Sequence, residues 1–114
     1  MIKSSYLKGI ISELYVLAFL IFKGYRPIKW RMRNIVSEID LIVKKNNVLI
    51  ALEVKYRKKS DDGLYAIHKR QQQKIRSAFE VFSSRHQKNA FHTLRCDVCI
   101  VNQYGFIQHL KNAF

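Results

Sequence analysis

The stretch SEIDLIVKKNNVLIALEVK, from Ser37 to Lys55, decides the fold, because it reads as two strands joined by a short polar turn. Both runs are rich in β-branched and aliphatic residues, as expected for buried strands. Charged residues nevertheless interrupt them, namely Glu38, Asp40, Glu53 and Lys55. Charged side chains are rarely buried without partners, so their placement in these strands needs an explanation.

The length of the turn determines which charged side chains share a face of the hairpin. With Asn46-Asn47 as the central residues of a two-residue turn, Asp40 lies opposite Glu53. Glu38 then lies opposite Lys55. Opposed residues share a face, with Cβ atoms roughly 4.5–5.5 Å apart. A four-residue loop preserves the shared face and a three-residue loop removes it, so this pairing is conditional on the turn.

Two carboxylates held this close repel one another unless a proton or a cation lies between them. Carboxylate oxygens are the ligands that Mg²⁺ takes, with water and substrate phosphate at the remaining positions. Lys55 shares a face with Glu53 and is placed to hold a phosphate oxygen or an attacking water. A solvated face with cross-strand salt bridges is the alternative interpretation. Apolar flanks and a total of only eight acidic residues favour the metal site.

Composition indicates one folded domain over residues 1–114 with a polyanionic partner. Apolar residues make up 48% of the 114-residue chain, enough for a core without disulfides. Lysine and arginine number 21 against 8 acidic residues, which gives a net charge of +13. A charge of this size implies DNA, RNA or an anionic membrane surface as the partner.

The first apolar segment, GIISELYVLAFLIF, covers residues 9–22 and predicts a buried helix of a cytoplasmic protein. It is too short and too charged for a membrane span. Glu13 interrupts the apolar run and no small-residue cleavage site follows, which argues against a signal peptide. The helix is expected from Ser4 or Ser5 to about Phe22, with Gly24 as its stop. Helical spacing predicts a core face of Leu7, Ile10, Ile11, Leu14, Ala18 and Ile21.

The remaining segments complete an α/β fold with a mixed sheet flanked by helices, in the order α-β-β-β-α-β-β. A second helix is expected over about Ala66 to Ser84, with a core stripe of Gln71, Ile75, Ala78, Phe79 and Phe82. The strands are expected at Tyr25–Arg33, Ser37–Val43, Val48–Tyr56, Leu94–Val101 and Phe106–Leu110.

Cys96 and Cys99 form a C-x-x-C within a predicted strand, where a separation of three places them on opposite faces. They cannot share one metal ion there, and no second cysteine pair exists to complete a zinc site. We therefore expect core thiols. Asp97 is expected to form an ion pair with Arg95 or a helix residue, with no catalytic role.

The ordered motifs of this chain resemble those of the YraN family of small bacterial endonuclease-like proteins, within the PD-(D/E)XK superfamily. The resemblance covers nearly the whole chain and includes Gly9 and Glu13, KGY (23–25), EIDLI (38–42), LEVKYR (52–57), RCDV (95–98) and LKNAF (110–114). It implies a restriction-endonuclease-like fold and metal-dependent hydrolysis of phosphodiester bonds, leaving 5′-phosphate and 3′-hydroxyl ends.

The resemblance also implies roles for individual residues. Asp40 and Glu53 would bind Mg²⁺ or Mn²⁺, and Lys55 would assist the attacking water. Glu13 matches an additional acid that many relatives direct toward the metal, although a helix carboxylate reaching solvent is the simpler alternative. Glu38 and Gln71 are accessory candidates, the first paired with Lys55 or with a basic residue of the neighbouring strand. For Gln71 the alternative is an ordinary polar residue of the second helix.

The basic residues around this site are expected to bind backbone phosphates without reading sequence, namely Arg31, Arg33, Arg57, Lys58, Lys59, Lys69 and Arg70. DNA, in a structured or branched form, is favoured over RNA as the substrate. A homodimer is compatible with cutting two strands, and no membrane association is expected. The alternative is a basic nucleic-acid-binding protein that retains the fold without catalysis.

Overall fold

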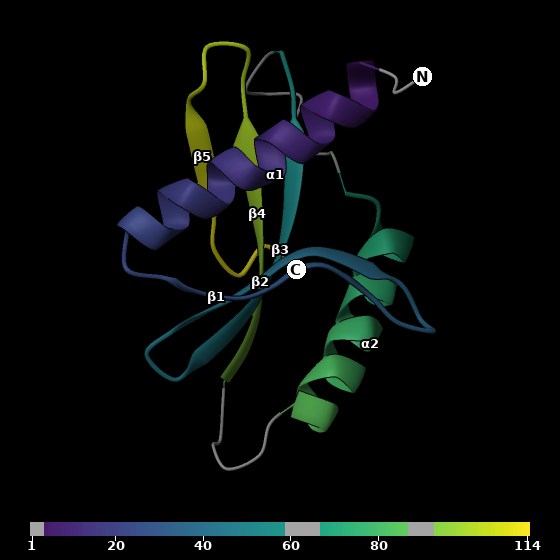
Figure 1. Ribbon diagram of the computed structural model, residues 1–114. Helices are drawn as coiled ribbons and strands as arrows, with labels where there is room; N and C mark the ends of the chain where they lie inside the picture. Colours follow the sequence, from purple (N-terminus) through teal and green to yellow (C-terminus); the bar gives the residue numbers. More distant parts are fainter. Residues whose placement is uncertain (1–3, 59–66, 87–92) are drawn as a thin grey trace.

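The computed structural model describes residues 4–58, 67–86 and 93–114 (Figure 1). Helices and strands follow the expected order α-β-β-β-α-β-β, and the strands form one mixed sheet in the order β1-β2-β3-β4-β5. Only β3 and β4 are parallel, and the other neighbours are antiparallel. The elements are α1 (Ser4–Phe22), β1 (Arg26–Arg33), β2 (Glu38–Lys45), β3 (Val48–Tyr56), α2 (Lys69–His86), β4 (Thr93–Val101) and β5 (Ile107–Leu110).

The two helices cover opposite faces of the sheet (Figure 1). Alternating strand residues divide between two hydrophobic cores, because successive side chains on a strand point to opposite faces. The α1-side core includes Val16, Leu20, Leu41, Val43, Ile50, Leu52 and Cys99. The α2-side core includes Ile42, Leu49, Ala51, Cys96 and the α2 residues Ile75, Ala78, Phe79 and Phe82. The expected apolar stripe of the second helix is therefore confirmed.

The turn between β2 and β3 is the expected two-residue turn. Lys45 pairs with Val48, and Asn46 has a φ of 56°, a positive value that asparagine tolerates. The register continues as predicted to the pair Leu41–Leu52 and ends there. Asp40 and Glu53, the next residues in register, are thus the first residues beyond the paired region.

Beyond the Leu41–Leu52 pair β2 separates from β3, and this point is called the fork. The far end of β2 pairs only with β1, for example through Met32 and Ile39, which both join the α2-side core. Asn34 follows β1 and donates a 3.0 Å hydrogen bond from Nδ2 to the Ala78 carbonyl of α2. Packing against α2 therefore draws the end of the β1–β2 pair away from β3 and opens the sheet at the fork.

The buried face of α1 differs from the expected one. The buried residues are Ser12, Glu13, Val16 and Leu20, whereas Leu7, Ile11, Leu14, Ala18 and Ile21 are exposed and Ile10 is half-buried. Ile11, for example, leaves 62% of its surface exposed. The helix is apolar on nearly all sides, so periodicity alone does not identify the face that packs on the sheet.

The edge strand β1 also departs from the expected alternation. Its register shifts between Pro27 and Lys29, and Arg31 has a φ of 54°. These irregularities leave Ile28 and Trp30 partly exposed, and only Met32 of the expected apolar residues is buried. No helix within the described ranges is long and apolar enough to cross a membrane.

Candidate active site

Asp40 and Glu53 meet at the fork, one from each separating strand. Asp40 Oδ2 accepts a 2.9 Å hydrogen bond from the backbone N–H of Val54, so the end of β3 fixes the orientation of this carboxyl. Glu53 exposes only 6% of its surface. Because the strands no longer pair here, a side chain of β2 occupies the position where a backbone carbonyl would otherwise bond to β3. The sequence-based register thus identified the two acids, and the fork brings their side chains into contact.

The environment of Glu53 favours its protonated form. Burial, a hydrogen bond with the Asp40 carboxyl and the negative charge of Asp40 together raise the pKa of Glu53 to about 9. Lys55 opposes the shift and Glu13 adds to it. At neutral pH the Asp40–Glu53 pair therefore holds a proton, and a bound cation would satisfy the same electrostatic requirement.

Two further polar groups approach the Glu53 carboxylate from different elements. Gln71, in the first turns of α2, donates from Nε2 to Glu53 Oε2 over 2.6 Å. The Lys55 ammonium lies 3.9 Å from the same oxygen, as expected for side chains two residues apart on one strand face. Four of the residues predicted for the site are thus brought together: Asp40, Glu53, Lys55 and Gln71.

Glu13 approaches this group from α1 but is bound to other partners. Trp30 donates from Nε1 to Glu13 Oε1 over 3.0 Å, and Arg31 donates from Nε to the same oxygen over 2.9 Å. The Glu13 carboxylate raises the pKa of the Arg31 guanidinium, mainly through their hydrogen bond. Its carboxylate is buried and paired, so the alternative of a carboxylate reaching solvent is wrong. Glu13 contributes a negative charge near Glu53 and connects α1 to β1.

Glu38 lies away from the central group. It pairs with Arg33 of the neighbouring strand, and both side chains are largely exposed. The expected position opposite Lys55 is not adopted, because β2 has already separated from β3 at this point. Of the two partners considered for Glu38, the basic residue on the adjacent strand is the one observed.

The basic residues expected to bind phosphate divide into paired and unpaired ones. Arg31 and Arg33 are neutralised by Glu13 and Glu38, and Arg57 donates to the Tyr56 carbonyl. The remaining described members are exposed, namely Lys58 after β3 and Lys69 and Arg70 at the start of α2. Lys59 lies outside the described residues. Among the residues that the structure describes, cations without a carboxylate partner therefore lie just after β3 and at the start of α2.

Asp97 on β4 forms a buried network that is larger than the ion pair expected from sequence. Asp97 is fully buried and accepts two 2.9 Å hydrogen bonds from Arg95, one of 2.8 Å from His109 Nε2 and one from the Asn112 N–H. Burial opposes ionisation of Asp97, but these hydrogen bonds outweigh it and hold its pKa below the usual value. The Arg95–Asp97 spacing indicated the ion pair, whereas His109 and Asn112 gave no recognisable signal.

Cys96 and Cys99 point to opposite faces, as predicted from their spacing, and join the two different cores. Both are free thiols. Burial raises the pKa of Cys96 to about 11 and that of Cys99 to about 12, which keeps both protonated at neutral pH. The interpretation as core thiols is confirmed.

The donor set at the fork fits a hard divalent ion with an incomplete protein shell. Within the ranges 4–58, 67–86 and 93–114, no group of three or more His, Cys, Asp and Glu residues is arranged to hold a metal. Mg²⁺ is typically bound through one or two carboxylates, with water and substrate phosphate completing the octahedron. Asp40 and Glu53 supply two such carboxylates, already in contact and in need of a positive partner.

Comparison with known sequences places this arrangement in a family. A family model described as "Uncharacterised protein family UPF0102" matches residues 12–101 of the chain. The chain belongs to the UPF0102 family. This is the YraN family that the sequence motifs resemble, and the matched range contains Glu13, Asp40, Glu53, Lys55 and Gln71.

Individual UPF0102 proteins cover most of the chain. A UPF0102 protein of Rhodopseudomonas palustris (strain BisB18) is 40% identical over 106 residues, which is 93% of this chain and 78% of the relative. One of Sinorhizobium medicae (strain WSM419) is 36% identical over 109 residues, or 94% of this chain and 88% of the relative. These matches establish family membership, and their names state no activity.

Proposed function

We propose that this UPF0102 protein is a divalent-metal-dependent nuclease that hydrolyses phosphodiester bonds of DNA at the fork between β2 and β3. The observation that carries the proposal is the position of Asp40 and Glu53 at the fork, with Asp40 held by the Val54 N–H and Lys55 3.9 Å from Glu53. Two acids and a lysine from adjacent strands supply both a cation site and a fixed positive charge.

Asp40 and Glu53 would hold the ion, either Mg²⁺ or Mn²⁺. When bound, it would polarise the scissile phosphate and lower the pKa of a water ligand. Ion binding requires Glu53 to give up the proton that its surroundings now favour, so binding and deprotonation are coupled. Gln71 keeps the Glu53 carboxylate oriented through its 2.6 Å hydrogen bond during this exchange.

Lys55 has a separate task. Its ammonium carries three N–H donors and is partly exposed, so it can contact solvent and an incoming phosphate while remaining beside Glu53. In that position it would orient the attacking water and stabilise negative charge on the phosphoryl oxygens. A fixed positive charge placed where negative charge develops in the transition state typically raises the rate about 10²–10³-fold.

Nucleic acid is the proposed substrate because the chain carries a net charge of +13. Lys58, Lys69 and Arg70 are exposed near the ends of the elements that carry Lys55 and Gln71. Their contacts with phosphates would supply affinity without sequence preference. The same charge is also sufficient for a protein that binds nucleic acid without cutting it, so cleavage itself must be measured.

The decisive experiment is cleavage of labelled single-stranded, duplex, flapped and branched DNA by the purified protein, with Mg²⁺, with Mn²⁺ and with chelator. We expect metal-dependent cleavage that Asp40→Asn and Lys55→Ala each reduce by about 10²-fold or more. Glu80→Gln, which changes an exposed acid of α2, is the matched control and should retain activity. Cleavage that persists in both site variants, or binding without cleavage of any substrate, would overturn the nuclease assignment.

A further inference from the structure

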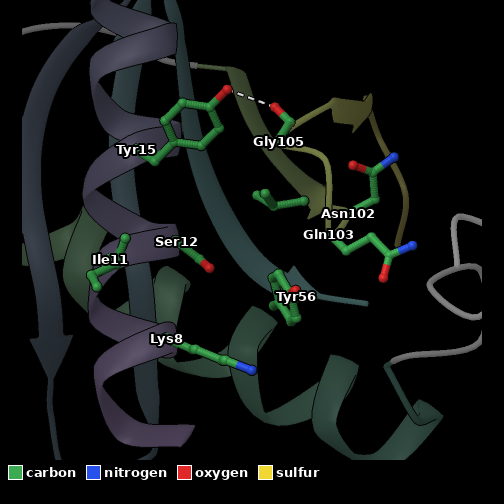
Figure 2. Close-up of a pocket in the computed structure, with 9 residues that line it drawn as sticks. Lys8, Ile11, Ser12, Tyr15, Tyr56, Asn102, Gln103 and Gly105 are labelled. Atoms are coloured by element: carbon green, nitrogen blue, oxygen red, sulfur yellow. Dashed lines mark hydrogen bonds between the residues drawn. The ribbon is translucent and has the colours of Figure 1, made fainter. Parts of the chain in front are cut away.

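A pocket of about 460 Å³ lies between α1, the end of β3 and the β4–β5 turn (Figure 2). Its volume falls within the range of about 300–1,000 Å³ typical of small-molecule sites. Lys8, Ser12 and Tyr15 line it from α1, Tyr56 from β3, and Asn102 and Gln103 from the turn. None of these residues belongs to the Asp40–Glu53 site.

The Ser12 hydroxyl is the first sign that this pocket holds a ligand. Ser12 exposes only 6% of its surface, and no residue in the described part of the chain forms a hydrogen bond with its side chain. Figure 2 shows the hydroxyl turned from the helix toward the pocket. Buried polar groups are nearly always hydrogen-bonded, so an unpaired hydroxyl facing a cavity suggests a partner that enters from outside.

The wall opposite Tyr56 is fixed before any ligand binds. The Tyr15 hydroxyl donates a 2.6 Å hydrogen bond to the carbonyl of Gly105, which connects α1 to the β4–β5 turn (Figure 2). Within that turn, Asn102 Oδ1 accepts hydrogen bonds from the N–H groups of Tyr104 and Phe106. These hydrogen bonds fix the turn that forms this wall, and a pre-formed site loses little entropy on binding.

The ligand chemistry follows from the aromatic and cationic groups. Lys8 places its ammonium 5.4 Å from the centre of the Tyr56 ring. The pocket therefore offers an aromatic face, an exposed cation and a buried hydroxyl on largely apolar walls. A nucleotide matches this combination, because its base has a flat π face and edge acceptors and its phosphate pairs with an ammonium.

The pocket also adjoins the candidate active site along two elements. Ser12 directly precedes Glu13 on α1, and Tyr56 directly follows Lys55 on β3. Successive side chains on a strand point to opposite faces, so Tyr56 packs on the α1 side of the sheet, whereas Glu53 and Lys55 face the α2 side. The pocket and the site therefore share the end of β3 from opposite faces, and a strand of nucleic acid held at the fork would reach the pocket by passing around that end.

We propose that this pocket binds one unpaired nucleobase of the nucleic-acid substrate, stacked on Tyr56 and hydrogen-bonded by Ser12. The inference rests on the proposed function and specifies its substrate class. A base can enter only when it is not paired, so the preferred substrate contains a single-stranded segment that extends from the fork around the end of β3. Fully paired duplex would use the basic surface alone.

The test is equilibrium binding of a labelled single strand and of a blunt duplex of the same sequence, at fixed salt and with chelator so that nothing is cut. Tyr56→Ala should weaken single-strand binding about 5- to 100-fold, because stacking is lost. Duplex binding should change little. Tyr56→Phe retains the ring and should bind normally, as should Phe22→Ala, which removes an exposed aromatic at the far end of α1.

A second pair of variants covers the case in which Tyr56→Ala does not fold. Gln103→Glu and Gln108→Glu make the same charge change at exposed positions, but only Gln103 lines the pocket. Gln103→Glu should weaken single-strand binding about two- to tenfold more than Gln108→Glu, because it places a negative charge at the wall of the pocket, where it repels a phosphate and an acceptor-rich base. Equal effects of the two, on single strand and duplex alike, would overturn the pocket assignment.

The outcomes separate this inference from the nuclease proposal. If Tyr56 and Gln103 variants lose single-strand preference while no substrate is ever cut, the pocket assignment stands and the nuclease assignment fails. If Asp40 and Lys55 are required for cleavage but the pocket variants bind both substrates as well as the parent protein, the reverse holds.

Discussion

Gln71 Nε2 donates a 2.6 Å hydrogen bond to Glu53 Oε2, so α2 fixes the carboxylate that β3 contributes to the fork. The two residues come from elements on either side of the connection from β3 to α2, and Gln71 continues the stripe that anchors α2 to the sheet. The helix therefore has two roles in this fold. It supports the separated end of β2, and it orients one of the two acids at the site.

Gln71→Leu should lower the affinity for a divalent ion without removing a ligand. Loss of a hydrogen bond that orients a metal-binding carboxylate typically costs 10–100-fold in affinity or activity. The measurement is the Mg²⁺ concentration that gives half-maximal cleavage, together with the Mn²⁺ concentration that gives half the maximal rise in melting temperature. Gln73→Leu changes an exposed residue of the same helix and should alter neither value.

The raised pKa of Glu53 predicts that this group makes the protein less stable as pH rises. In the unfolded chain the carboxyl ionises near 4.5, whereas in the folded protein its pKa is about 9. Between these values the folded state binds more protons, so its free energy of unfolding falls with increasing pH. Urea unfolding between pH 5 and 9 should therefore show a decline that Glu53→Gln reduces. A decline of the same slope in that variant would contradict the assigned pKa.

Divalent ions should reverse this trend. Binding of Mg²⁺ or Mn²⁺ to the folded state alone stabilises it, by about 2.7 kcal/mol at a concentration one hundred times the dissociation constant. The gain should be larger at pH 8 than at pH 6, because Glu53 must lose its proton on binding. Thermal melts with and without metal measure this, and Asp40→Asn should abolish the gain. An equal metal effect in Asp40→Asn would place the ion elsewhere.

Asp97→Asn should destabilise the protein strongly while leaving the fork intact. Breaking a buried ion pair by removing one partner costs about 3–5 kcal/mol, and the partial exposure of Arg95 favours the lower end. The depressed pKa of Asp97 also means that its contribution is present above pH 3.8 and is lost as pH falls through the folded value. Urea unfolding at pH 7 gives the loss. Cleavage below the melting temperature should be retained, and its disappearance would indicate a role beyond stability.

The salt dependence of DNA binding should distinguish unpaired from paired cations. Each phosphate contact contributes about 0.9 to the slope of log affinity against log salt concentration. Lys58→Ala and Lys69→Ala should each reduce the slope by about this amount, since both are exposed. Arg33→Ala should change it less, because Glu38 already neutralises Arg33. Equal reductions by all three variants would show that the Arg33–Glu38 pair opens on binding.

The hairpin could be predicted from sequence because its information is local. Alternation along two strands and the Asn46-Asn47 turn determine the register, and the register identifies Asp40 and Glu53 as the acids next beyond the last pair. The stripe of α2 and the opposite orientation of the two cysteines follow from the same kind of short-range periodicity. In each case the periodic pattern lies within one or two secondary-structure elements.

Tertiary structure decided what these local patterns leave open. The buried face of α1 carries Glu13 and Ser12 and not the regular apolar stripe, because a helix that is apolar on most sides can pack in several orientations. Contacts with α2 open the fork, and the pocket combines residues from α1, β3 and the β4–β5 turn. The sequence alone thus determined which residues can carry the chemistry. Long-range packing determined their distances and partners, because these depend on elements far apart in the chain.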